Sequence, residues 1–155
     1  MKLLKKLPSR VLLFSVLLFL AERPGSAAEK NPQSVQVTIR SILAGNKADE
    51  FDAKLKGMES QLKSLKYRSY RSLKDDSKIV PWQGTQSFDI PGGRTLTVTP
   101  QEFQDNRIAV KVRLTEGEKP VVDTTVKIPN KGNFILAGPA HEGGVLVLSI
   151  SAAAQ

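Results

Sequence analysis

The chain has 155 residues, with 23 Lys and Arg against 15 Asp and Glu, one His and no Cys. This length fits one domain, and the lack of Cys excludes disulfide bonds, a thiolate nucleophile and a thiolate metal site. The net charge of +8 falls to +4 without residues 1–28, which hold five of the basic residues and one acidic residue. Because no groove-reading motif is present either, we expect no nucleic-acid partner.

The first 28 residues have the order of a secretory signal peptide. The chain opens with four basic residues, Lys2, Lys5, Lys6 and Arg10. The apolar run 11–21 follows, and Ser26-Ala27-Ala28 provides small residues before a signal-peptidase cut at Glu29. As a helix this run rises about 16 Å, roughly half of the hydrocarbon core, so cleavage is favoured over a retained anchor. We therefore expect an exported chain, periplasmic or extracellular, with no transmembrane segment after the cut.

The cleaved chain begins with a flexible lead-in, residues 29–34, followed by an alternating run at 35–39 that predicts a half-buried strand ending near 44–46. Residues 49–66 predict the only helix, which Asn46 or Asp49 can cap at its start. Its apolar residues, spaced three and four apart, form one narrow stripe: Phe51, Leu55, Met58, Leu62 and Leu65. We expect this stripe to pack on a sheet.

From residue 67 onward, short apolar runs are separated by turn signals every ten to thirteen residues, which is typical of an antiparallel meander. The runs are 67–73, 85–90, 94–99, 107–115, 120–128, 133–137 and 145–150, with a loop at 75–84. The last run is apolar on both faces, so we expect it to be central or covered by the helix. The sequence thus predicts one α+β domain over 35–151, in which an antiparallel, curved or sandwich-like sheet of about seven to eight strands carries one amphipathic helix. Residues 152–155 are expected to be a disordered tail.

Three glycine-containing turns predict strand register, if each is a three-residue hairpin loop. The loops are 91–93, 116–118 and 130–132. They set these apolar pairs opposite each other: Phe88 with Leu96, Val112 with Val122, and Ile128 with Phe134.

The positive charge that remains after cleavage is concentrated in residues 54–78, which hold eight Lys and Arg against three Asp and Glu. Six of them form a candidate binding face: Lys54, Lys63, Lys66, Arg68, Arg71 and Lys74. An envelope protein or an anionic envelope component would suit this face. The alternative is the solvated side of a helix and an edge strand, where Lys also blocks edge-to-edge pairing.

Three aromatic residues are further binding candidates. Tyr67 and Tyr70 alternate with the basic residues, and Trp82 follows Pro81 in the predicted loop. An exposed Trp82 could stack on a glycan or contact a lipid, which gives a second hypothesis for the function. The alternative is that Trp82 covers one end of the core.

The sequence carries little that indicates catalysis. His141 beside Glu142 could act as a general base in a hydrolase, but no nucleophile or further ligand is marked near them. Asp75 and Asp76 are flanked by Lys, which is typical of a solvated turn. We therefore expect a non-catalytic protein without a metal or cofactor.

The cleaved chain resembles small exported bacterial proteins of unassigned function. This resemblance depends on the opening strand, the helix with Asp52 and Leu55, the motif Phe88-Asp-Ile-Pro-Gly-Gly93 and the closing apolar strand. It implies an exported binding or accessory protein of the bacterial cell envelope.

A narrower resemblance covers residues 124–150. The runs 124–128 and 134–138, the turn at Gly132 and the final apolar strand are similar to the strand pairs of secretin outer-membrane channels. The chain departs from secretins at Pro139, where they have a second Gly, and it is too short for their channel domain. The resemblance implies an association with a secretion or envelope assembly, and no channel.

Overall fold

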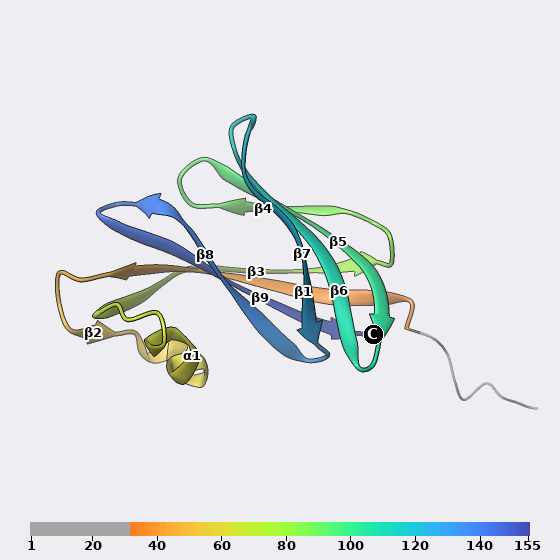
Figure 1. Ribbon diagram of the computed structural model, residues 1–155, viewed down its shortest axis with the longest axis horizontal. Coiled ribbons are helices and arrows are strands. Elements are labelled where there is room, and N and C mark those ends of the chain that lie inside the picture. Colours follow the sequence, from red (N-terminus) through yellow and green to blue (C-terminus); the bar gives the residue numbers. More distant parts are fainter. Residues whose placement is uncertain (1–31) are drawn as a thin grey trace, which may run out of the picture. The chain divides into compact units, whose positions relative to one another are not determined.

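The computed structural model describes residues 32–155, so the predicted signal peptide and the lead-in up to residue 31 lie outside the described residues. The described chain consists mostly of strands, which form two sheets (Figure 1). It has nine strands rather than the expected seven to eight, and only two short helices. The α+β prediction is confirmed only in part: the fold is rich in strands and has two sheets, but its helical content is smaller than an α+β fold would have.

The first sheet has five strands in the order β2-β3-β1-β9-β8. Their bounds are β1 Ser34–Gly45, β2 Glu50–Phe51, β3 Ser69–Pro81, β8 Gly132–His141 and β9 Gly144–Ala154. All neighbours in this sheet are antiparallel except β2 and β3. A 3₁₀ helix, Ala53–Met58, and the helix α1, Glu59–Lys63, connect β2 to β3.

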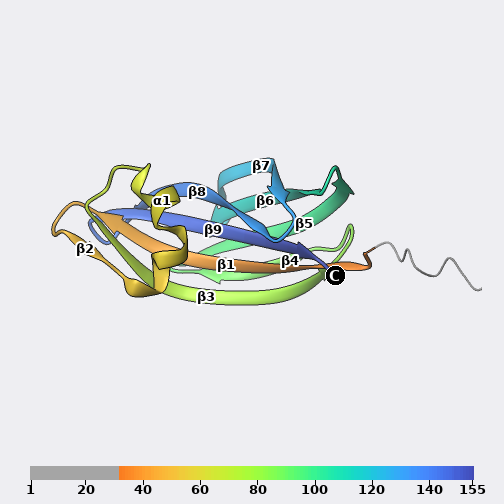
Figure 2. The same ribbon diagram turned by 90° about the horizontal axis from the view of Figure 1, so that it is seen from below.

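The second sheet has four strands in the order β4-β5-β6-β7, all antiparallel. Their bounds are β4 Gln86–Ile90, β5 Arg94–Gln104, β6 Arg107–Glu116 and β7 Lys119–Pro129. Figure 2 shows this sheet on one side of the five-stranded sheet and the two short helices at one end.

The central core lies between the two sheets. Alternate residues of a strand share a face, so the period-two runs of the sequence place their apolar side chains on the inner side. The five-stranded sheet contributes Val35, Val37, Ile39, Val80, Leu146, Leu148, Ile150 and Ala152. The four-stranded sheet contributes Phe88, Ile90, Leu96, Val98, Ile108, Val110, Val112, Leu114, Val126 and Ile128.

A smaller side core lies on the opposite face of the five-stranded sheet. It consists of Ile42, Ala44, Tyr70 and Val147 from the strands and Leu55 and Leu62 from the helices, all buried. Phe51, Met58 and Leu65 pack against it, so the predicted apolar stripe does lie on a sheet. Strand β9 is an interior strand of its sheet and its Val147 packs with the helices, so the prediction that it is covered by the helix is confirmed.

The predicted helix over 49–66 is too long. Residues 50–51 form β2, which pairs with Ser69 and Tyr70 of β3, and the Asp52 carboxylate accepts a hydrogen bond from the Lys54 amide. Asp52, rather than Asn46 or Asp49, therefore caps the first helix. Gly57 near the middle of the predicted helix costs about 1 kcal/mol of helix stability relative to Ala. This weak helix propensity and the pairing of residues 50–51 with β3 both shorten the helix. No helix within residues 32–155 is long and apolar enough to cross a membrane.

The loop expected at 75–84 is mostly strand, because β3 continues to Pro81 beside the whole length of β1. Asp75 is not in a turn: its two carboxylate oxygens accept hydrogen bonds from Arg40 of β1 at 2.8 and 3.0 Å. Polar residues fit a strand here because one face of β3 lies in solvent.

One of the three predicted hairpin loops is confirmed. Residues 91–93 connect β4 to β5 and place Phe88 opposite Leu96. The β6–β7 turn is tighter than expected: Glu116 lies opposite Lys119, and Val121 is an extra residue in β7. This bulge restores the alternation and places Leu114, rather than Val112, opposite Val122.

The third predicted hairpin is wrong in its pairing. Strands β7 and β8 belong to different sheets, and Phe134 lies opposite Ile150 of β9 rather than Ile128. The chain crosses between sheets at Lys131, whose φ is 68°. Ile128 and Phe134 still face the same central core, because the side-chain alternation fixes the face and not the neighbouring strand.

The expected tail at 152–155 is also ordered. Strand β9 reaches Ala154, which lies opposite Val35. The amide of Gln155 donates to the Ser34 carbonyl, and the amide of Gln33 donates to the Gln155 carbonyl. The last residues of the predicted lead-in and tail thus pair with each other, which satisfies backbone groups of both.

Candidate functional site

Four exposed lysines of the helical segment form a lysine surface: Lys54, Lys56, Lys63 and Lys66. They lie on or directly after the two short helices, and Glu59 is the one acidic residue among residues 53–66. The Lys63 ammonium lies 2.7 Å from the Glu59 carboxylate and 5.9 Å from the centre of the Phe51 ring. The side core packs these helices against the five-stranded sheet and so positions the lysine surface.

Arg68 is paired, in contrast to these lysines. Its Nε and Nη2 each donate to the Asp49 carboxylate at 2.9 Å. The hydrogen bond and charge of Arg68 lower the pKa of Asp49, and Asp49 raises the pKa of Arg68. Arg68 therefore adds little net charge to the predicted basic face.

Lys74 also lies away from the lysine surface. The Lys74 ammonium donates to the Asp89 carbonyl of β4, and Lys78 donates to the Ser87 carbonyl of the same strand. Both lysines thus connect edge strand β3 to edge strand β4 across the open side of the sandwich. Their amines occupy backbone acceptors that an added strand would need.

Arg71 lines a cleft of about 230 Å³ at one end of the five-stranded sheet. Two cations, Lys47 and Arg71, and two anions, Glu50 and Glu142, border the cleft. A Cβ atom at Gly143, whose φ is 79°, would lie 3.1 Å from the Lys47 Nζ, so a side chain there would displace Lys47. The paired glycines of the β8–β9 turn were the sequence signal for this close approach. The balanced charges make the cleft a weaker anion site than the lysine surface.

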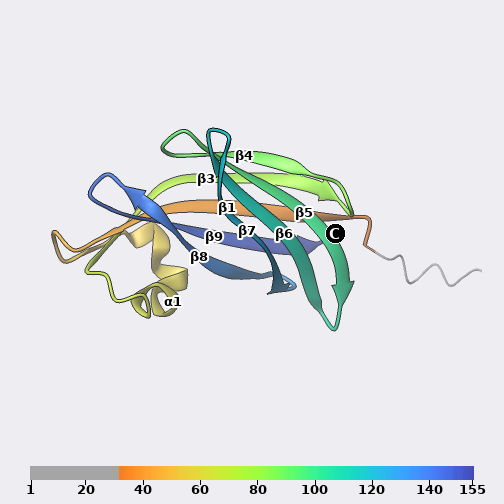
Figure 3. The same cartoon turned by 45° about the horizontal axis from the view of Figure 1, so that its top comes forward.

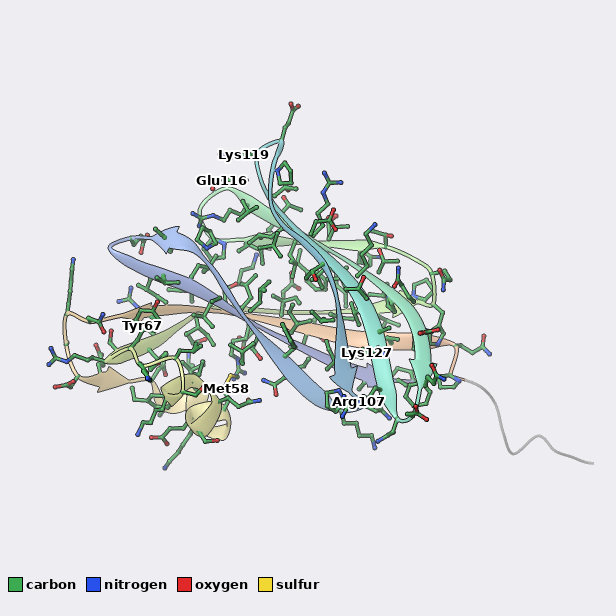
Figure 4. The ribbon with its side chains drawn as sticks, viewed as in Figure 1. Met58, Tyr67, Arg107, Glu116, Lys119 and Lys127 are labelled. Atoms are coloured by element: carbon green, nitrogen blue, oxygen red, sulfur yellow. The ribbon has the colours of Figure 1, made fainter. Side chains whose placement is uncertain are left out.

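The predicted tyrosine candidates are not both accessible. Tyr70 is buried in the side core, where its hydroxyl donates to the Leu62 carbonyl and accepts a hydrogen bond from the Tyr67 amide. Its role as a binding residue is therefore corrected to a structural one. Tyr67 is half-buried, with its ring centre 6.4 Å from that of Tyr70 in an edge-to-face contact. Figure 4 shows Tyr67 and Met58 near the helical segment.

Trp82 lies at the end of β3 and packs against the central core. Its ring is half-buried, and its centre lies 6.3 Å from the centre of the Phe103 ring. Phe103 is 39% exposed, which makes the pair a partly open apolar end of the sandwich. Neither ring of this pair is isolated on the surface.

His141 is part of a connection between the two sheets. The buried guanidinium of Arg94 in β5 donates to the Ala140 carbonyl at 2.9 Å and to the Pro91 carbonyl at 3.0 Å. Its Nη1 also lies 3.2 Å from His141 Nδ1. Since a guanidinium only donates, Nδ1 accepts, and a neutral His141 ring carries its proton on Nε2. The geometry explains His141 as a structural partner of Arg94.

Glu142 lies beside His141 with 3.9 Å between its carboxylate and His141 Nε2. Within residues 32–155, no group of three His, Asp or Glu side chains is close enough to hold a metal ion. The expectation of a non-catalytic protein stays a prediction.

Comparison with protein-family models, with curated proteins and with solved structures finds no match to this chain. The resemblances to small exported proteins and to secretin strand pairs therefore stay predictions. What the fold and the site define is a two-sheet β protein with a lysine surface at one end.

Proposed function

We propose that this chain is an exported, non-catalytic binding or accessory protein of the bacterial cell envelope, acting with a secretion or envelope assembly. The signal-peptide pattern of residues 1–28 supports the location. The lysine surface is the observation that carries the binding function, because residues 53–66 hold four exposed cations and one acidic residue, Glu59.

The occupant that fits the lysine surface is an anionic envelope component. Lysines near an anionic membrane surface contribute about 1 kcal/mol each, and the attraction falls off within a Debye length. Arg40, Arg68 and Lys74 are engaged within the protein, whereas Lys54, Lys56 and Lys66 make no side-chain ion pair within the described residues. These free ammonium groups are available to phosphate or carboxylate groups of a partner.

The test compares two variants with the same change in charge. One changes the lysine surface to Glu: Lys54→Glu, Lys56→Glu, Lys63→Glu and Lys66→Glu. The control changes four exposed cations of the four-stranded sheet: Arg107→Glu, Lys111→Glu, Arg113→Glu and Lys127→Glu. Figure 4 shows Arg107 and Lys127 on the strands of that sheet, away from Met58 in the helical segment.

Binding is measured by co-sedimentation with vesicles of anionic phospholipid at low and physiological salt. We expect the lysine-surface variant to bind at least about tenfold more weakly than wild type, and the control to bind within about threefold of it. Equal losses of binding in both variants would mean that net charge, and not the lysine surface, determines binding. A wild-type protein that does not bind the vesicles would contradict the proposal. Circular dichroism checks that both variants are folded.

A further inference from the structure

The four sheet edges of the described chain differ in how they are protected. Strand β3 is covered by β2 at Ser69 and Tyr70, and its Lys74 and Lys78 occupy carbonyl groups of edge strand β4. Strand β7 contains Pro120 and Pro129, which lack an amide donor, and the charged residues Lys119, Asp123 and Lys127. Charges, prolines and covered backbone are the usual means by which edge strands avoid pairing with other chains.

Strand β8 lacks most of this protection. In the described residues it pairs with β9 alone, so alternate backbone groups on its other side point away from the sheet. Residues 132–140 contain no charged side chain, and their one proline, Pro139, lies in a bulge between Ala137 and Ala140, so that residues 132–137 form the regular part of the open edge. Figure 3 shows β8 as the border of the five-stranded sheet.

The side chains of β8 are nevertheless those of an interior strand. Phe134 and Leu136 pack against the central core, and Ile135 packs against the side core on the other face. None of the ten residues of β8 is fully buried, whereas five consecutive residues of its neighbour β9 are. A strand with apolar side chains on both faces is typical of the interior of a sheet. The side-chain pattern of β8 therefore suits a strand with a neighbour on each side, whereas β8 has a neighbour on one side only.

We propose that β8 pairs with β8 of a second copy of this chain, in an antiparallel arrangement about a two-fold axis. Lys131 precedes the strand and Glu142 follows it, and both side chains are exposed. Antiparallel pairing places each Lys131 near the Glu142 of the other copy, whereas parallel pairing would place like charges together. The two five-stranded sheets then form one continuous sheet whose centre has no charge.

The proposal makes a second prediction about where the two-fold axis lies. In a symmetric pair the middle of the strand faces itself, so Ala137, which is exposed and lies near the middle directly before the bulge, is placed close to its own copy. A charge at this position would therefore meet the same charge in the partner. Opposite charges at Ala137 in two different copies would attract each other.

The test is the oligomeric state of the purified protein, measured by sedimentation velocity over a range of concentrations. We expect a wild-type dimer, and we expect Ala137→Lys and Ala137→Glu each to raise the dissociation constant by at least about tenfold. An equimolar mixture of the two variants restores the dimer as a heterodimer. The control Thr124→Lys adds the same charge to the protected edge β7, where Thr124 is exposed, and leaves the dimer unchanged.

Each result decides the question without relying on one variant's folding. Recovery of the dimer in the mixture shows that both variants are folded and that the positions face each other. The proposal would be overturned if the wild type is monomeric at all concentrations, or if neither Ala137→Lys nor Ala137→Glu changes the dissociation constant of the dimer. An equal loss in Thr124→Lys would overturn it as well, because the contact would then not be at β8. A dimer of wild type with no vesicle binding would separate this inference from the proposed function.

Discussion

The central core and the side core are built from the same kinds of side chain but depend on different parts of the fold. The central core joins eight strands of two sheets, and many of its residues are fully buried. The side core joins a patch of one sheet to two short helices through Leu55 and Leu62. Removing contacts from the first affects the whole domain, whereas the second can open locally while the sheets stay paired. The central core therefore stabilises the fold, and the side core positions the lysine surface.

Leu148→Ala should have the largest effect on this comparison. Leu148 is fully buried in β9, an interior strand between β1 and β8, and truncation there leaves a cavity that flanking strands cannot fill. We expect the free energy of unfolding to fall by about 3–5 kcal/mol, measured by urea denaturation. A loss below about 1 kcal/mol would contradict the view that β9 is the shared wall of the central core.

Leu62→Ala should have a smaller and more local effect. Leu62 is also fully buried, but α1 has five residues and can move toward the cavity or detach. We expect a loss of about 2–3 kcal/mol, with faster amide hydrogen exchange in residues 53–66 and little change in β5 and β6. Equal acceleration of exchange in the four-stranded sheet would mean that the two cores unfold as one unit.

The pH dependence should be the smallest effect and should act on the side core first. Hydrogen bonds from the amides of Lys54 and Ser72 lower the pKa of Asp52 in the folded protein. A lowered folded-state pKa means that the charged carboxylate stabilises the fold above the pKa of the unfolded chain, and this contribution is lost as the pH falls below about 4. Wild type and Asp52→Asn should therefore differ in stability at pH 7 and converge toward pH 2.

The measurement for Asp52 is urea denaturation of both proteins at several pH values, with hydrogen exchange at the lowest pH that keeps the domain folded. Residues 53–66 should exchange faster at low pH before the strands of the central core do. Asp89→Asn serves as the control, because Asp89 is exposed on β4 and should not change the difference between the two cores. A stability difference between wild type and Asp52→Asn that does not change with pH would contradict the role of the carboxylate.

Local pattern predicted the strands of the four-stranded sheet well. The alternation in residues 107–114 places Ile108, Val110, Val112 and Leu114 in the central core, and the loop at 91–93 sets the register of β4 and β5. These features depend on residues close in sequence, so the period of the side chains and the turn type suffice. The bulge at Val121 could not be predicted, because a three-residue loop and a two-residue loop with a bulge both keep the apolar residues on one face.

The candidate site was predicted only in part. Lys54, Lys63 and Lys66 are exposed on or after the two short helices, and Lys56 of the same segment is exposed as well. The other three predicted residues differ from these lysines: Arg68 pairs with Asp49, Arg71 borders the cleft, and Lys74 donates to β4. The number of charged residues in a segment does not predict which of them form ion pairs or hydrogen bonds with residues 15 or more positions away in the sequence.

The sequence by itself determined most of the side chains that face a core, because the alternation in strands follows from backbone geometry. The apolar stripe Phe51, Leu55, Met58, Leu62 and Leu65 also faces a core, although Phe51 lies in β2 and Leu55 and Met58 lie in the 3₁₀ helix. Only the tertiary structure decided which strands are neighbours. Strand β8 pairs with β9 rather than with β7, and the polar part of β3 pairs with β1. Pairing between distant segments satisfies backbone hydrogen-bonding groups, and the local side-chain pattern carries no information about it. The same long-range choice leaves one edge of β8 open and separates the free lysines from the engaged ones.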